Sequence, residues 1–153
     1  MRKISKFLTV AALLAVFVFL FAACPNPIET TPSGYFLWER GDDGTIIITG
    51  YDQNGPGAVI IPGHIHGHRV STIGTMAFFE RGLTSVTIPP NTTIRADAFS
   101  NNQLTRITLG ENVILNSLFG NPPFGSSFDT FFNNNNRKAG TYTWDGRNWS
   151  FQD

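Results

Sequence analysis

The sequence has little charge and almost no cysteine, and both shortages limit what the protein can be. Charged residues make up 14% of its 153 residues, and the formal net charge is zero. Binding to nucleic acid needs a basic stripe, so this composition argues against such a partner. Only one cysteine is present. No disulfide can therefore form within the chain, and packing alone must stabilise it.

Enzyme signatures are missing as well. The sequence has neither the Gly-X-Ser-X-Gly motif of serine hydrolases nor the Gly-X-X-X-X-Gly-Lys loop that binds nucleotide phosphates. Its acidic residues stand singly or in predicted turns. These absences predict a protein that is not an enzyme and carries no cofactor.

The chain begins with an apolar segment. Three basic residues precede an apolar run from Phe7 to Ala23, which is interrupted only by Thr9. A positive start, an apolar run and small residues at its end are typical of a secretory signal peptide, so we predict a signal helix over residues 1–23. The run is at the lower length limit for a spanning helix, so an uncleaved anchor and plain secretory cleavage are the alternatives.

The single cysteine, Cys24, directly follows Ala22 and Ala23 and resembles the lipobox of bacterial lipoproteins. The resemblance implies cleavage before Cys24, acylation of its thiol (palmitate) and anchoring to a bacterial membrane, at the outer membrane or cell surface. Phe21 stands where leucine is commoner, a relaxed form typical of spirochaetes. Residues 24–34 contain three prolines and predict an extended tether.

A repeat of 21 residues organises the middle of the chain. Leu83–Pro89 aligns with Leu104–Gly110, and Ile73–Phe78 aligns with Ile94–Phe99. Ile60–Pro62 is a further copy of the strand end, followed by an enlargement of six residues. Apolar and polar residues alternate in each copy, which predicts half-buried strands. One unit buries too little by itself, so neighbouring units must stack into a solenoid.

Each unit also carries an aromatic position. Phe78 and Phe99 follow an alanine at the same register, and we expect them on short helical turns with their rings facing inward. Phe79 has Ser100 at the matching position, so we expect it to be more exposed. The third unit reads Leu118-Phe119 at this point.

Over residues 59–120 the pattern resembles the BspA-type leucine-rich repeat. The resemblance implies a curved solenoid with a parallel sheet, and a bacterial surface protein with an adhesive role. The ending Gly140–Gly146 also looks like the tails of repeat lipoproteins from spirochaetes. Thr92 departs from the pattern, because valine is expected there.

Both ends of the repeat array are predicted to be β caps. Two alternating runs in residues 35–58 flank a glycine-containing loop and predict an N-terminal hairpin. Residues 121–153 predict a loop, including the polar tract Asn133–Asn136, and then a hairpin turning at Asp145-Gly146. The predicted fold class is therefore mainly β: a short leucine-rich-repeat solenoid of parallel strands with short helical turns, flanked by hairpin caps.

All three histidines of the chain, His64, His66 and His68, lie in the enlargement of the first unit. In an extended segment they would share one face and could bind zinc or copper. Gly63 and Gly67 instead favour a solvent-facing loop, which makes this only a weak candidate metal site.

The outward positions of the predicted strands form a candidate partner-binding face of Ser85, Thr87, Arg106 and Thr108. We expect a lipid-anchored surface protein whose solenoid binds proteins, as in adhesion to host or matrix proteins. The alternative is a passive structural or coat lipoprotein without a specific ligand. A face joined to aromatic residues in a concave patch favours binding, and a flat, polar face favours the coat.

The lipid anchor predicts a simple genetic result. Cys24→Ser removes the only thiol that can be acylated, so the protein should leave the detergent phase in detergent partitioning of the cells that make it. A variant that stays in the detergent phase would show that an uncleaved helix is the anchor.

Overall fold

The computed structural model describes residues 29–117 and 122–152. The predicted signal segment 1–23, Cys24 and Leu118-Phe119 lie outside the described residues. Within the described ranges, no helix is long and apolar enough to cross a membrane.

The described chain is mainly β, as predicted, with one short α-helix. Strands β1 to β5 are Phe36–Arg40, Ile46–Tyr51, Ala58–Ile60, His64–Ile65 and His68–Ile73. Strands β6 to β9 are Ser85–Ile88, Thr93–Ile94, Arg106–Leu109 and Ile114–Leu115. The 3-10 helix η1 is Ser33–Tyr35, helix α1 is Ser126–Asn134, and strands β10 and β11 are Gly140–Trp144 and Trp149–Gln152.

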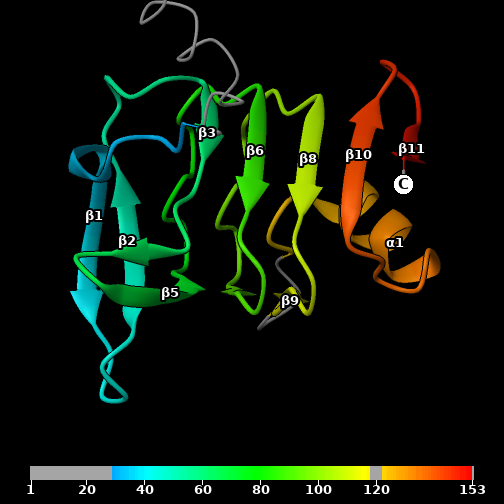
Figure 1. Ribbon diagram of the computed structural model, residues 1–153. Helices are drawn as coiled ribbons and strands as arrows, with labels where there is room; N and C mark the ends of the chain where they lie inside the picture. Colours follow the sequence, from blue (N-terminus) through cyan, green and yellow to red (C-terminus); the bar gives the residue numbers. More distant parts are fainter. Residues whose placement is uncertain (1–28, 118–121, 153) are drawn as a thin grey trace, which may run out of the picture.

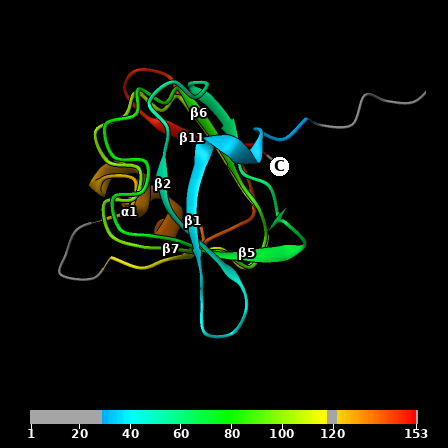
Figure 2. The same cartoon turned by 90° about the vertical axis from the view of Figure 1, so that its left-hand side faces the viewer.

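Two sheets run along a short β-solenoid. One has the order β1-β2-β5-β7-β9, with β4 paired to β5, and the other has the order β11-β10-β8-β6-β3. In Figure 1 strands β3, β6, β8 and β10 stand side by side, with β1 and β2 at one end of the molecule and α1 at the other. Figure 2 looks from the β1 end, where successive coils lie behind one another.

The strand register reproduces the predicted repeat. Ser85 in β6 pairs with Arg106 in β8, and Thr93 in β7 pairs with Ile114 in β9, both 21 positions apart. Ala58 in β3 pairs with Ser85, which includes the six-residue enlargement. All these pairs are parallel. Equivalent residues of successive units therefore occupy equivalent places in successive coils.

The backbone between strands repeats with the same period. Residues with positive φ recur in pairs 21 positions apart: Met76 with Asp97, Glu80 with Asn101, and Asn91 with Asn112. The expected short helical segments are single turns, in which the Ala77 and Ala98 N–H groups donate to carbonyls three residues earlier, at 3.3 Å in both coils. Left-handed residues interrupt these turns, so no regular helix continues from them.

Phenylalanine rings stack through the interior as predicted, one in each coil. The rings of Phe78 and Phe99 are both fully buried and lie 4.8 Å apart between centroids, 14° from parallel. The next ring in the stack is Phe124, 4.7 Å from Phe99 and 3° from parallel. The third position of the column is thus filled by Phe124, 25 residues after Phe99, where the sequence pattern placed Phe119.

Asn102 joins two neighbouring coils through its side chain. The amide nitrogen donates to the carbonyl oxygens of Phe78 and Phe99 at 2.7 and 2.8 Å. The amide oxygen accepts the backbone N–H groups of Arg81 and Leu83 at 3.0 and 2.9 Å. One side chain therefore satisfies turn groups that would otherwise lack a partner in the interior.

Thr92, which departs from the repeat pattern, is buried at 1% exposure. Its hydroxyl donates to the Pro89 carbonyl oxygen at 2.9 Å. The departure is tolerated because a buried hydroxyl with a partner avoids most of its desolvation cost.

The N-terminal cap is the predicted antiparallel hairpin, β1 with β2. The chain is docked before this hairpin, although residues up to 34 were expected in the tether. Thr31 is buried at 6% exposure, its N–H donates to the Ile60 carbonyl at 2.9 Å, and its hydroxyl accepts the Ile60 N–H at 2.9 Å. Thr31 thus covers the outer edge of β3.

The C-terminal cap contains a helix that sequence analysis missed. We expected a loop before the last hairpin, but residues 126–134 form α1, which buries Phe128 and Phe132. The polar tract Asn133–Asn136 ends this helix, and the Asn135 amide donates to the Phe131 carbonyl at 2.8 Å. The predicted hairpin β10–β11 follows, and β10 pairs antiparallel with β8.

The ring stack predicts a sharp contrast between neighbouring phenylalanines. Phe78→Ala should lower the free energy of unfolding by about 3–5 kcal/mol, because it removes a fully buried ring from the stack. Phe79→Ser should cost far less, since Phe79 is only partly buried. Urea melts of the two variants measure the difference, and equal losses would contradict the assigned register.

Candidate functional site

The four residues of the predicted face do lie together. Ser85 pairs with Arg106 and Thr87 with Thr108 across β6 and β8, and all four are partly or fully exposed. The face continues across the C-terminal hairpin through Thr141, Thr143, Ser150 and Gln152, which occupy the same two rows.

This face is a ladder of hydroxyl groups. The hydroxyls of Thr108 and Thr141 are 3.0 Å apart, and those of Thr143 and Ser150 are 2.9 Å apart. No aromatic residue occupies these rows among the described residues of β3, β6, β8, β10 and β11. By the criterion set above, a polar face of this kind favours the coat alternative over binding at this surface.

The histidines do not share a face. The enlargement is a tight hairpin of β4 and β5, in which His64 pairs with Arg69 and His68 with Ile65. The His66 ring contacts Trp38 at 5.6 Å between centroids, whereas His68 Nε2 accepts a hydrogen bond from Arg40. Within the part of the chain that the structure describes, no three His, Cys, Asp or Glu side chains are placed to bind one metal ion.

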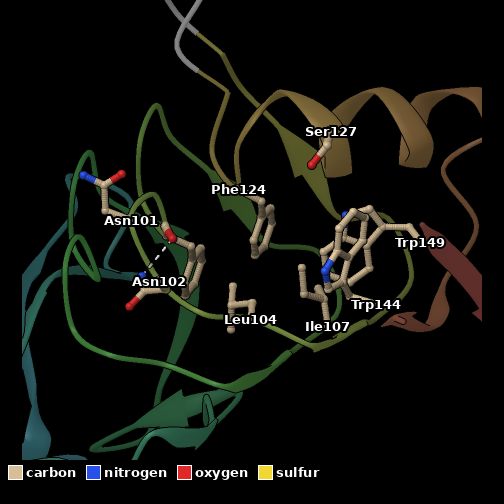
Figure 3. A pocket seen from close by; sticks show the side chains of 9 residues that line it. Asn101, Asn102, Leu104, Ile107, Phe124, Ser127, Trp144 and Trp149 are labelled. Carbon is tan, nitrogen blue, oxygen red and sulfur yellow. Dashed lines mark hydrogen bonds between the residues drawn. The ribbon is translucent and has the colours of Figure 1, made fainter. Parts of the chain in front are cut away.

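An aromatic depression lies at the C-terminal end of the solenoid (Figure 3). It has a volume of about 180 Å³. Its lining residues come from the segment 99–107, from the start of α1 and the residues just before it, and from the last hairpin. They are Phe99, Asn101, Asn102, Leu104, Ile107, Phe124, Ser127, Trp144 and Trp149.

The tryptophans of the depression are held by strand pairing. Trp144 and Trp149 are directly opposite each other in β10 and β11, and their rings lie 5.4 Å apart, tilted by 49°. Phe128 of α1 packs edge-on against Trp149 at 4.9 Å. Both tryptophans remain half-exposed, so their outer surfaces are open to a ligand.

The polar groups at the depression differ in their availability. The Asn102 amide is fully occupied by the turn contacts described above. Within the described chain, neither the Ser127 hydroxyl nor the indole N–H of Trp144 or Trp149 has a hydrogen-bond partner. In Figure 3 the Ser127 hydroxyl points towards the depression. These groups are therefore available to orient a bound molecule.

A second hollow of about 230 Å³ shares Ser127, Trp144 and Trp149 with the first, and Phe131, Arg147 and Asn148 complete its lining. Small-molecule sites usually measure ~300–1,000 Å³. Each hollow is smaller than that and suits a single side chain. Together they form a two-part surface with the tryptophan pair between its halves.

Sequence analysis predicted the hairpin that carries Trp144 and Trp149 as a cap, but it predicted no binding site there and missed Phe124 and Ser127. A signal for this region exists in the spacing of Phe124, Phe128 and Phe132, four residues apart, which is a helical period. Gly125 and the asparagines after these phenylalanines favour a loop, and they hid this helical signal.

Asp129 lies on α1 and lines neither hollow. It is 7% exposed, and its carboxylate accepts the Phe124 N–H at 3.3 Å. Burial raises the pKa of Asp129 to about 7, against a smaller lowering effect of that hydrogen bond. The side chain thereby links α1 to the segment that carries the third ring of the stack.

Two solved structures resemble this chain in sequence and fold. A leucine-rich-repeat protein of Treponema pallidum is 30% identical over 54% of this chain, with a TM-score of 0.47, and the match spans only 39% of that protein. A leucine-rich-repeat protein from Bacteroides capillosus is 32% identical over 56% of this chain and 70% of its own, with a TM-score of 0.49. No protein-family model and no curated protein matches the chain.

The raised pKa of Asp129 predicts a pH-dependent stability. The folded state binds the proton more tightly than the unfolded state, whose pKa is near 3.8. The stabilising effect of protonation is thus complete below pH ~4 and is lost as the pH rises through ~7. Urea melts should show a less stable protein at pH 8 than at pH 5.

Asp129→Asn should remove most of that difference, because an amide does not titrate. Asp145→Asn is the control, since backbone hydrogen bonds from Asn148 and Arg147 lower the pKa of Asp145 and its titration lies below this window. If Asp145→Asn also loses the pH dependence of stability, that dependence belongs to a group other than Asp129.

Proposed function

We propose that this chain is a protein-interaction scaffold that binds its partner at the aromatic depression. The observation that carries the proposal is the pair of half-exposed tryptophans, Trp144 and Trp149, beside hydrogen-bonding groups that have no partner among the described residues. Tryptophan is enriched where proteins bind one another, because it buries a large area and also donates a hydrogen bond.

The dimensions of the site support a peptide segment as the bound element. Two adjoining hollows of about 180 and 230 Å³ suit two side chains of one extended segment. The Ser127 hydroxyl and the indole N–H groups can then bond to the backbone of that segment. Among the described residues, Arg147 is the one charged side chain that lines either hollow, which favours a neutral or acidic segment.

We also propose that the protein is held at a bacterial surface by lipid on Cys24 and serves in adhesion. Support comes from the lipobox-like sequence and from the direction of the chain. Thr31 docks on β3, at the edge of the sheet furthest from β10 and β11. A tether that enters there lies at the opposite edge of this sheet from the hairpin β10–β11, which carries Trp144 and Trp149 (Figure 1).

The polar face favours a second function. Its hydroxyl groups hydrogen-bond to one another across strands, so few of them are left for a ligand. A protein whose surface is formed mainly by such a face would suit a passive coat without a specific partner.

Filling the depression distinguishes the two functions. Ser127→Tyr places a ring into the hollow from an exposed helix position, and should weaken binding to immobilised host matrix proteins by at least about tenfold if side-chain burial there drives binding. Ser126→Tyr is the matched control, because Ser126 is exposed in the same turn but lines neither hollow.

The readouts separate the possible outcomes. Loss of binding in Arg106→Glu with normal binding in Ser127→Tyr would move the site to the polar face. Absence of binding by the unmodified protein to every matrix protein tested would favour the coat.

A further inference from the structure

The two sheets have four end strands, β1, β9, β3 and β11, and their outer edges are not protected equally. Exposed strand edges recruit other strands, so native proteins usually shorten, charge, distort or cover them. At the β1 edge the register shifts between Leu37 and Trp38, and the strand carries Glu39 and Arg40. Strand β9 has only two residues, and the β3 edge is covered by Thr31.

The fourth edge, β11, has none of these protections. Its sequence, Trp149–Gln152, contains no charge, no proline and no bulge. It ends the order of its sheet, and among the described residues no loop bonds to the backbone of Trp149 or Phe151. Within the described chain, this is the one end strand whose edge stays open to another strand, and the branch strand β4 has only two residues.

The turn before β11 shows which backbone groups face outward. The Asp145 N–H donates to the Asn148 carbonyl at 3.2 Å, which makes these two residues a hydrogen-bonded pair. Such pairs alternate along an antiparallel ladder. The backbone groups of Ser150 and Gln152 therefore bond to β10. The backbone N–H and C=O groups of Trp149 and Phe151 point away from β10, towards the open edge of the sheet.

We propose that β11 pairs antiparallel with β11 of a second copy of this chain, about a two-fold axis at Ser150. In this register Trp149 of one copy faces Phe151 of the other as a hydrogen-bonded pair, and the two Ser150 residues form the non-hydrogen-bonded pair between them. The contact is isologous, so it closes as a dimer and does not continue into a fibre.

A second copy repeats the pairing chemistry that the sheet already uses. Inside, aromatic rings are cross-strand neighbours: Tyr142 with Phe151 at 5.0 Å, and Trp144 with Trp149 at 5.4 Å. Outside, hydroxyls pair across strands, Thr143 with Ser150 among them. The proposed dimer adds aromatic pairs on the inner face and a serine pair on the outer face, and no charges meet.

Four residues of strand edge bury less than the ~1,200 Å² of a standard interface, so the dimer is a transient contact. Cross-linking of the full chain in the membranes of producing cells is the suitable test. A non-hydrogen-bonded pair places the two Cα atoms ~4.5 Å apart, within the range that a disulfide spans.

Ser150→Cys should therefore give a disulfide-linked dimer on mild oxidation, at least about tenfold above its control, because only this position meets its own copy at disulfide distance. The control is Arg106→Cys, an exposed position on the same face of the interior strand β8. The unmodified chain reports any background from Cys24. Cross-linking of Ser150→Cys at the level of either control would overturn the proposal.

Variants of opposite charge show whether a loss of pairing comes from misfolding. Chemical cross-linking should join two differently tagged copies of Ser150→Lys less than two tagged copies of the unmodified chain, because like charges meet at the axis. A Ser150→Lys copy mixed with a Ser150→Glu copy should associate again. Failure of the mixed pair to associate would overturn the strand pairing, and its recovery would show that both variants are folded.

Discussion

The structure depends on one continuous column of aromatic rings. Contacts run from Tyr51 through Phe78, Phe99 and Phe124 to Phe128, with neighbouring centroids 4.7–5.0 Å apart. The column then continues into the C-terminal hairpin through the rings of Tyr142 and Trp149. Without a disulfide in the chain, this stacking and the strand ladders around it hold successive coils together. Each coil of a solenoid contacts only its neighbouring coils, so the loss of one ring exposes the rings before and after it.

The way the ring column ends accounts for both the aromatic depression and the open edge of β11. A repeat array must terminate its column, and here the rings of Phe36 and Tyr51 close one end, 6.2 and 5.0 Å from Phe78. At the other end α1 and the hairpin β10–β11 close it with larger rings. The aromatic depression beside Trp144 and Trp149 lies at this end. The same hairpin turns the sheet from parallel to antiparallel and leaves β11 as its last strand.

Much of the fold was predictable because repetition amplifies a weak local signal. The 21-residue offset, the inward Phe78 and Phe99 and both hairpins follow from patterns that the sequence displays more than once. Helix α1 and the third ring were not predictable in this way, because the last unit departs from the period. Phe124 lies 25 residues after Phe99, so alignment at 21 pointed to the neighbourhood of Phe119.

The candidate site shows the same division. The sequence by itself determined which residues alternate outward on β6 and β8, because strand geometry has a period of two. Only the tertiary structure decided that this face is a self-bonded hydroxyl ladder, since Thr141, the cross-strand neighbour of Thr108, lies 33 residues away in the chain. It also brought Leu104, Ser127 and Trp149 to one depression. No local sequence pattern indicates that these three residues lie close together, because their proximity depends on how the irregular last unit covers the end of the ring column.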